Sequence, residues 1–460
     1  MNLGSDNRQK TRQQRDSVSA EAGEARQPEQ REFESRSARS EDESPAETET
    51  MMEEICEWKN LREAIGQVKA NKGSAGIDGV ETDELPGYRQ LAEIREQLLS
   101  GTYKPLPVRR VEIPKPGGGI RKLGIPTVLD RMVQQAVMQV LQKRWDRTFS
   151  DSSFGFRPGR GAQQAVERAQ QYIASGYGWV VDLDLEKFFD RVHHDKLMGQ
   201  IAKRIGDKRL LRLIRSFLNA GVMENGLVSP AMEGTPQGGP LSPLLSNLVL
   251  DELDRELERR GHRFVRYADD CNIYVRSEKA GQRVMESLRR FISKRLKLKV
   301  NEQKSAVARP QVRKFLGFSF SAGPDIRRLI APQAIQRLKD RMREITRRSR
   351  SQSLDHTLKV LVPYLLGWRG YFGFCQTPEV LIGLSGWIRR RLRAAIWRQW
   401  KTPRRRRTQL FQLGVGAALA ASTARSSAGP WHLSRTKALC IALSNAYFRS
   451  RGLPTLWVTS

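Results

Sequence analysis

Apolar residues recur along the chain at two spacings, one typical of helices and one typical of strands. Apolar positions three or four residues apart predict amphipathic helices over 58–69, 91–99, 130–145, 162–174, 208–220 and 244–260. Short apolar runs at 178–185 and on both sides of a turn within 264–275 predict a strand and a hairpin. Helices mixed with antiparallel hairpins indicate an α+β fold and not a doubly wound parallel sheet.

Composition narrows the class of protein. The chain has 460 residues, 39% of them hydrophobic, and 80 Lys and Arg against 50 Asp and Glu, for a net charge of +30. Its four cysteines form no Cys-x-x-Cys pair, which excludes a disulfide framework, a zinc ribbon and an iron–sulfur site and fits a reducing compartment. The longest small-apolar stretch, 414–421, is far shorter than a membrane span, so no membrane association is expected. The charge excess predicts a polyanionic partner, with nucleic acid as the first candidate.

The charge is distributed unevenly. Residues 1–50 hold 8 basic and 12 acidic residues with few large apolar side chains, which predicts a disordered tail. Residues 321–460 hold 26 basic and 5 acidic residues. Aromatic residues interleave the arginines there: Tyr364, Trp368, Tyr371, Phe372, Trp387, Trp397 and Trp400. Arginines with stackable rings suit phosphates and unpaired bases. A solvated basic helix face is the alternative, which the scarcity of nearby acids disfavours.

Four aspartates fall in two separate sequence patterns. Asp269 and Asp270 lie between two β-prone arms, at the expected tip of a hairpin. Asp182 and Asp184 share one face of the 178–185 strand, opposite its apolar face. Aspartate is a common turn residue, so the hairpin pair alone is weak evidence. Together, the hairpin and the strand offer hard oxygen ligands for two Mg²⁺ ions, the arrangement that clamps in-line phosphoryl transfer.

At this point the sequence resembles a known family. Asp184 to Asp190 reads Asp-x-x-x-x-Phe-Asp, and 267–270 reads Tyr-Ala-Asp-Asp, as in the palm of reverse transcriptases. Five further blocks occur in the family's order, at 71–79, 121–127, 154–160, 234–243 and 314–318. As a set they resemble bacterial group II intron-encoded reverse transcriptase/maturases over about residues 55–460.

The resemblance implies a right-hand polymerase followed by an α-helical maturase region. Fingers and a palm with an antiparallel sheet would occupy 51–325, and the helical thumb would start at 326–360, where a helix is expected over 335–345. Residues 361–460 would form the remaining thumb, the RNA-binding maturase region and a short basic DNA- or RNA-binding segment. The last fifty residues hold one histidine and one cysteine, so no endonuclease domain is expected. Without an endonuclease to cut the second DNA strand, the primer would come from a replication fork or from another pre-existing DNA end.

The resemblance also assigns roles in catalysis. It makes Asp184, Asp269 and Asp270 the catalytic residues and the ligands of two Mg²⁺ ions, and leaves Asp182 as a supporting hydrogen-bond acceptor. Phe189 would lie under the incoming sugar and exclude a 2′-hydroxyl, although a plain core aromatic is the alternative. Lys304 would lie near the leaving pyrophosphate as a proton donor, with a solvated lysine as the alternative.

Further positions concern substrate binding. Gln237 and Gly238 match the turn against the nucleotide and template strand, where a helix-initiating turn is the plain alternative. Lys115 and Arg121 match finger residues that hold the triphosphate. The primer grip would comprise Phe315, Leu316 and Gly317. A metal-binding role for 193–195 is unlikely by its position after a helix start, and these residues are expected at the surface.

The function implied is that of an RNA-directed DNA polymerase that copies its own intron RNA and, as a ribonucleoprotein, promotes splicing and insertion into DNA. Its partners would be group II intron RNA, the DNA target and primer, and dNTPs, in the cytoplasm of a bacterium near the nucleoid. The oligomeric state stays open. Two alternatives remain: an RNA-folding factor whose polymerase has decayed, and a reverse transcriptase of a retron or defence element. The intact aspartates disfavour the first and the long aromatic-basic region the second.

Overall fold

The computed structural model describes residues 48–85, 87–114, 118–224, 227–229, 233–235, 238–348 and 352–457. Most of the predicted tail, together with Lys115 and Gln237, lies outside these ranges. At the first described residue, the carbonyl of Thr48 accepts a hydrogen bond from the amide of Asp207 at 2.9 Å. None of the described helices is both long and apolar enough to cross a membrane.

The N-terminal part combines helices with a small sheet. The helices are α2 (Met51–Ile55), α3 (Trp58–Ala70), η1 (Thr82–Glu84), α4 (Tyr88–Ser100), α5 (Val128–Trp145) and η2 (Asp146–Thr148). The sheet has the order β2-β1-β4-β5, with β1 (Val108–Pro114), β2 (Ile120–Ile125), β4 (Val222–Glu224) and β5 (Leu227–Ser229). β1 and β2 pair as an antiparallel hairpin, and α5 starts where the Thr127 hydroxyl accepts from the Asp130 amide.

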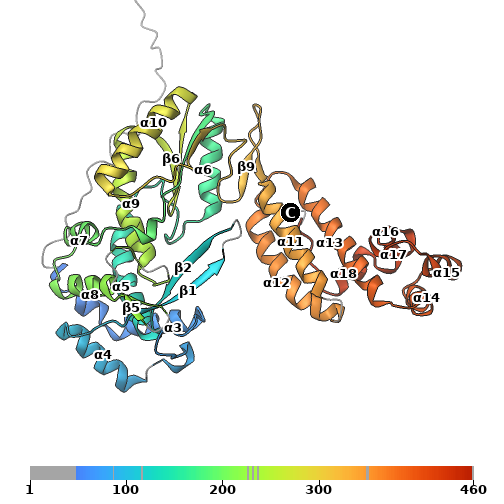
Figure 1. Cartoon of the computed structure of the whole chain (residues 1–460), viewed down its shortest axis with the longest axis horizontal. Helices are drawn as coiled ribbons and strands as arrows, with labels where there is room; N and C mark the ends of the chain where they lie inside the picture. Colours follow the sequence, from blue (N-terminus) through green and yellow to red (C-terminus); the bar gives the residue numbers. More distant parts are fainter. Residues whose placement is uncertain are drawn as a thin grey trace, which may run out of the picture. The chain divides into compact units, whose positions relative to one another are not determined.

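A second sheet forms the centre of the region between about residues 160 and 310. Its order is β6-β7-β3-β8, from β3 (Trp179–Leu183), β6 (Arg263–Tyr267), β7 (Asp270–Val275) and β8 (Ala306–Ala308), with every pairing antiparallel. Helix α6 (Ala162–Ala174) covers one face, while α9 (Ser242–Arg259) and α10 (Glu278–Phe291) cover the other (Figure 1). Connecting helices are η3 (Phe188–Asp190), α7 (His194–Ala202), α8 (Lys208–Asn219) and η4 (Ile292–Leu296).

Strand alternation explains why this sheet is covered on both faces. Val181 and Leu183 pack with α9 and α10 in one core cluster, whereas Val180 packs with α6 in another. The same alternation sends Asp182 to the α6 face, opposite Val181, as the sequence predicts. The predicted strand, the hairpin and the helices over 162–174 and 244–260 are confirmed, which also confirms the α+β class.

The remaining chain is almost entirely helical. A short hairpin of β9 (Phe318–Phe320) and β10 (Arg328–Ile330) leads into it. The helices are α11 (Pro332–Arg348), α12 (Leu354–Phe372), α13 (Pro378–Gln399), α14 (Pro403–Gln412), α15 (Ala417–Arg425), α16 (Pro430–Leu433), α17 (Lys437–Ala442) and α18 (Asn445–Ser450). Helix α11 contains the helix predicted over 335–345, and its apolar stripe (Leu338, Met342) lies at the core of this region.

Candidate active site

Asp184 and Asp270 meet at the same end of the central sheet. The antiparallel register pairs Leu183 with Cys271, so one residue further along the two strands reach Asp184 and Asp270. Because side chains alternate along a strand, the carboxylates of Asp184 and Asp270 point to the face of the sheet opposite the one that carries Leu183 and Cys271. Asp269 occupies the two-residue turn between β6 and β7, next to this pair. The three aspartates predicted as a group are therefore brought together by strand pairing.

Burial makes Asp269 and Asp270 harder to ionise than exposed aspartates. Burial raises the pKa of Asp270 to about 7, and the neighbouring charges of Asp182, Asp269 and Asp184 add to this effect. Burial also raises the pKa of Asp269, with a further contribution from Asp184. Concentrated, desolvated negative charge of this kind marks functional sites more often than structural ones.

Asp184 is held by the segment that follows α10. Its amide donates to the hydroxyl of Ser305 at 3.0 Å, and its carbonyl accepts from the Asn301 amide at 2.8 Å. The Lys304 ammonium lies 3.4 Å from Oδ2 of Asp184, so this lysine faces the carboxylates. The main chain around Asp184 is thus fixed while its carboxylate stays half-exposed.

Asp182 has a different environment, although it lies on the same strand face. It is buried, and the guanidinium of Arg313 donates to its Oδ2 from both Nε, at 2.8 Å, and Nη2. Burial raises the pKa of Asp182, and the Arg313 charge opposes that shift. The ion pair occupies the carboxylate, which agrees with the supporting role expected of it.

The donor set suits a hard divalent cation. Among the described residues, no three His, Cys, Asp or Glu side chains stand close enough together to form a closed metal cluster. The carboxylates of Asp184, Asp269 and Asp270 nevertheless supply the oxygen ligands that Mg²⁺ prefers, and Mg²⁺ takes only one or two protein carboxylates plus water and phosphate. The residues therefore fit an ion that is completed by substrate.

Phe189 lies at the edge of the core cluster that contains Leu183, Leu185 and Phe188. Its half-buried ring packs edge-on against Phe188, with ring centroids 5.1 Å apart. Its carbonyl accepts from the Thr235 amide at 2.7 Å, and a Cβ on Gly234 would lie 2.8 Å from the same carbonyl oxygen. The Phe189 ring is thus held by its contact with Phe188, while part of it remains exposed to solvent.

The predicted substrate-binding positions lie partly within the described residues. Gly238 has a positive φ of 142°, and a Cβ there would lie 2.6 Å from the carbonyl oxygen of Gly124 in β2. Gly238 therefore lies close against the backbone of β2. On the same strand Arg121 is exposed, and its charge lowers the pKa of Asp269 against the larger effect of burial.

A tight turn carries the three residues predicted to grip the primer. Phe315 is buried, whereas Leu316 and Gly317 are half-buried and both have positive φ, 51° and 83°. The Tyr371 hydroxyl donates to the Leu316 carbonyl at 2.8 Å, and a Cβ on Gly317 would lie 3.1 Å from the Phe372 ring. Helix α12 therefore positions this turn, whose tip is Leu316 and Gly317.

The expectation of a surface location is wrong for His194. Its side chain is 5% exposed, and Nε2 lies 2.6 Å from the carbonyl oxygen of Gly234. Gly234 packs against the main-chain carbonyl of Phe189, so His194 holds the segment that contacts the Phe189 backbone. His193 is exposed as expected.

Comparison with known proteins agrees with this geometry. A family model described as "Reverse transcriptase (RNA-dependent DNA polymerase)" matches residues 113–320, and one described as "Group II intron, maturase-specific domain" matches 335–412. Protein YkfC of Escherichia coli (strain K12) is 34% identical over 293 residues, covering 55% of this chain and 76% of YkfC. The chain belongs to the group II intron-encoded reverse transcriptase/maturase family.

Two further matches are more partial. The group II intron-encoded protein LtrA of Lactococcus lactis subsp. cremoris is 32% identical over 323 residues, covering 55% of this chain and 54% of LtrA. A chain of the solved "Partial Cas6-RT-Cas1--Cas2 complex" is 26% identical, covers 53% of this chain and 42% of its own length, and has a TM-score of 0.34. The family combines RNA-directed DNA synthesis, which uses divalent metal ions, with a maturase role in splicing and intron mobility. This chain carries both domains.

The maturase domain uses most of its aromatic rings internally. Four of the rings that interleave the arginines are buried, namely Trp368, Phe372, Trp397 and Trp400. Trp387 is half-buried, with the guanidinium carbons of Arg343 and Arg391 5.8 and 6.0 Å from its ring centroid. Most of these rings therefore pack inside the helical region and are not available at its surface.

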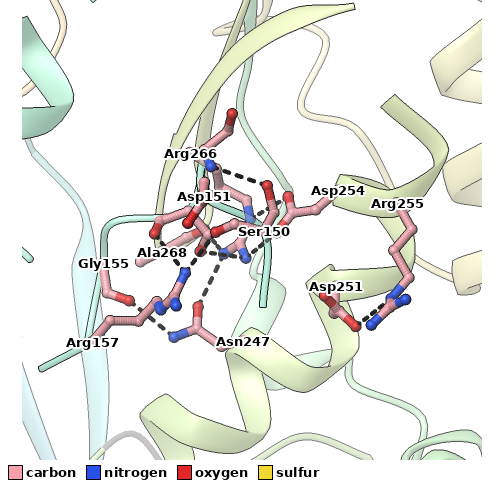
Figure 2. Close-up of polar contacts among 12 residues, drawn as sticks. Ser150, Asp151, Gly155, Arg157, Asn247, Asp251, Asp254, Arg255, Arg266 and Ala268 are labelled. Carbon is pink, nitrogen blue, oxygen red and sulfur yellow. Dashed lines mark hydrogen bonds and ion pairs between the residues drawn. The ribbon is translucent and has the colours of Figure 1, made fainter. Parts of the chain in front are cut away.

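The sequence patterns did not predict the polar network next to the turn that carries Asp269 (Figure 2). Arg266 is fully buried and paired with the equally buried Asp254 of α9. A signal for both residues was present in the sequence. Arg266 lies two residues after Phe264 and therefore on the same, core-facing side of β6. Asp254 lies on the apolar stripe of α9, between Leu250 and Leu257.

Proposed function

We propose that this reverse transcriptase copies the RNA of its own intron with Asp184, Asp269 and Asp270 as the catalytic carboxylates of a two-Mg²⁺ site. The observation that supports this most directly is the strand register that brings Asp184 beside Asp270, next to the turn holding Asp269. When bound by these carboxylates, a pair of Mg²⁺ ions supplies charge neutralisation at the attacking and leaving oxygens of phosphoryl transfer.

Each neighbouring residue takes a separate task in the proposed reaction. The primer 3′-hydroxyl attacks the α-phosphate of a dNTP while Leu316 and Gly317 hold the primer end. Arg121, with Lys115, binds the triphosphate, and Lys304 donates a proton to the leaving pyrophosphate. Phe189 closes the space that a 2′-hydroxyl needs, so deoxyribonucleotides are selected. Positioning and charge stabilisation then provide most of the rate.

The helical region gives the protein its RNA partner in this proposal. The exposed arginines of α14 and its neighbours contact phosphates of the intron RNA, and the resulting ribonucleoprotein promotes splicing and insertion at a DNA target. The same proposal places the particle in the bacterial cytoplasm, beside the nucleoid where its DNA target lies.

A primer-extension assay on a homopolymer RNA template tests the catalytic assignment. Asp184→Asn keeps the shape of the side chain but removes its charge, so extension should fall to background while RNA binding stays at the wild-type level. The matched control is Asp195→Asn, an exposed aspartate paired with Arg215 away from the site. Near-wild-type extension by Asp184→Asn would overturn the assignment.

The same assay separates the alternatives. An RNA-folding factor with a decayed polymerase would bind intron RNA and assist splicing, yet the wild-type protein would not extend the primer. A reverse transcriptase of another element would extend the primer but would not accelerate splicing of a group II intron. The proposed function requires both activities in one chain.

A further inference from the structure

Arg266 donates hydrogen bonds from every guanidinium nitrogen, within a fully buried site. Nε donates to Oδ1 of Asp254 at 2.7 Å, and Nη2 donates to Oδ2 of Asp254 at 2.5 Å and to Ser153 Oγ at 2.8 Å. Nη1 donates to Oδ1 of Asn247 at 3.0 Å and to the carbonyl oxygen of Ala268 at 2.9 Å. The last contact connects a buried ion pair to the turn that precedes Asp269 (Figure 2).

Ala268 needs such support because its backbone is unusual. It has a φ of 57°, a conformation that a non-glycine residue adopts only with compensation from its surroundings. Ala268 and Asp269 form the two-residue connection between β6 and β7, so the conformation at 268 sets the direction in which Asp269 and Asp270 leave the turn. Arg266 binds the carbonyl of this residue directly.

The loop around Gly155 supports the other side of the turn. A Cβ at Gly155 would lie 2.3 Å from the Ala268 amide nitrogen, so only glycine permits this approach. The Gly155 carbonyl accepts from Asn247 Nδ2 at 2.9 Å, and Asn247 also accepts from Arg266. Helix α9, the loop and the hairpin are therefore joined by one set of hydrogen bonds around Ala268.

A role in stability alone does not account for this arrangement. A buried ion pair pays a desolvation cost, and apolar residues of similar volume often stabilise a core equally well. What apolar residues lack is a donor for the Ala268 carbonyl and a partner for Asn247.

We infer that Arg266, held by Asp254 and Asn247, is a positioning residue that sets the turn carrying Asp269 and Asp270. This inference rests on the proposed function of those aspartates. Its consequence is that catalysis and divalent-ion binding depend on a guanidinium that touches neither substrate nor metal.

The test is the double variant Arg266→Met/Asp254→Leu, which removes both buried charges together and leaves no unpaired ion. We expect it to fold and to bind RNA like the wild type. Its kcat should fall about a hundredfold, because a small misplacement of catalytic groups has an effect of that size. The Mn²⁺ affinity measured by electron paramagnetic resonance should fall at least fivefold.

Two further variants separate positioning from general destabilisation. Leu257→Ala removes a buried side chain from the same helix, one turn away from Asp254, and should lower the melting temperature while kcat stays within twofold of wild type. Gly155→Ala pushes on Ala268 without touching the ion pair, so it should lower kcat and Mn²⁺ affinity as the double variant does. It also provides the test if the double variant does not fold.

The outcomes distinguish this inference from the proposed function. Wild-type kcat and Mn²⁺ affinity in a folded double variant, or in Gly155→Ala, would overturn the positioning role while leaving the polymerase assignment intact. If the wild-type protein itself extends no primer, the proposed function fails. The Mn²⁺ measurement then still decides whether Arg266 positions the aspartates.

Discussion

Lys304 places its ammonium nitrogen 3.4 Å from Oδ2 of Asp184. The backbone around this contact is not free to move, since the Lys304 carbonyl accepts from Nη2 of Arg313 at 2.6 Å. Arg313 in turn pairs with Asp182 of β3, two residues before Asp184. Lys304 is thus linked directly to Asp184 and, through Arg313, to Asp182 in β3, and its charge faces the proposed catalytic carboxylates.

Lys304→Met should lower kcat about a hundredfold and change the KM for dNTP little, because a proton donor to the leaving group acts mainly in the transition state. Single-nucleotide incorporation under saturating dNTP measures the effect. Lys299→Met is the control, since that exposed lysine pairs with Glu186 and not with Asp184. Equal kcat for the two variants would mean that Lys304 is an ordinary solvated lysine.

The Mg²⁺ requirement of the enzyme should depend on pH because of Asp270. Its pKa is raised from 3.8 to about 7, so below pH 7 a proton competes with the ion for this carboxylate. We expect the Mg²⁺ concentration for half-maximal extension to rise by up to about tenfold per pH unit below 7 and to level off above it. Titrations at pH 6, 7 and 8 measure this, and an equal Mg²⁺ requirement at all three would contradict the raised pKa.

Phe189→Ala should increase the use of rNTPs relative to dNTPs by at least tenfold. Removal of the half-buried ring opens the space that a 2′-hydroxyl would occupy, while Phe188 beneath it stays in the core. The ratio of kcat/KM values for the two sugars is the measurement. Phe189→Tyr retains a ring of the same thickness and should keep the selectivity; unchanged selectivity in the alanine variant would remove the proposed gate.

Intron RNA binding should weaken steeply with salt through the exposed arginines at the start of α14. Replacing three of them by Gln should reduce the slope of log K against log salt by about 2, since each phosphate contact contributes about 0.7 to 0.9. The variant changes Arg404, Arg405 and Arg407, and leaves Arg406, which donates to the Trp400 carbonyl.

The control variant for this experiment also loses three positive charges. It replaces three arginines that are already ion-paired, Arg255, Arg259 and Arg295. Because their charge is compensated within the protein, the slope should change little. A similar slope for wild type and the α14 variant would place the RNA contacts elsewhere.

Local sequence patterns predicted most of the elements around the site. Helix α6 begins and ends at the residues that its apolar spacing indicates. The hairpin with Asp269 and Asp270 follows from alternation and turn residues, as does the strand before Asp184, although β3 ends at Leu183 and not at the predicted residue 185. The predicted surface location of His194 was wrong because it is buried by a contact with Gly234, forty positions away, which local sequence patterns cannot reveal.

The amino-acid sequence was enough to single out Asp184, Asp269 and Asp270 as the proposed catalytic carboxylates, because a strand face and a turn are each defined by a few adjacent positions. It did not determine how those carboxylates are held. The contacts of Arg266 with Ser153, Asn247 and Asp254, and of Asp184 with Ser305, join positions 12 to 121 residues apart. Only tertiary packing decided them, because a buried charge is tolerated solely where separate elements converge to satisfy each of its hydrogen bonds.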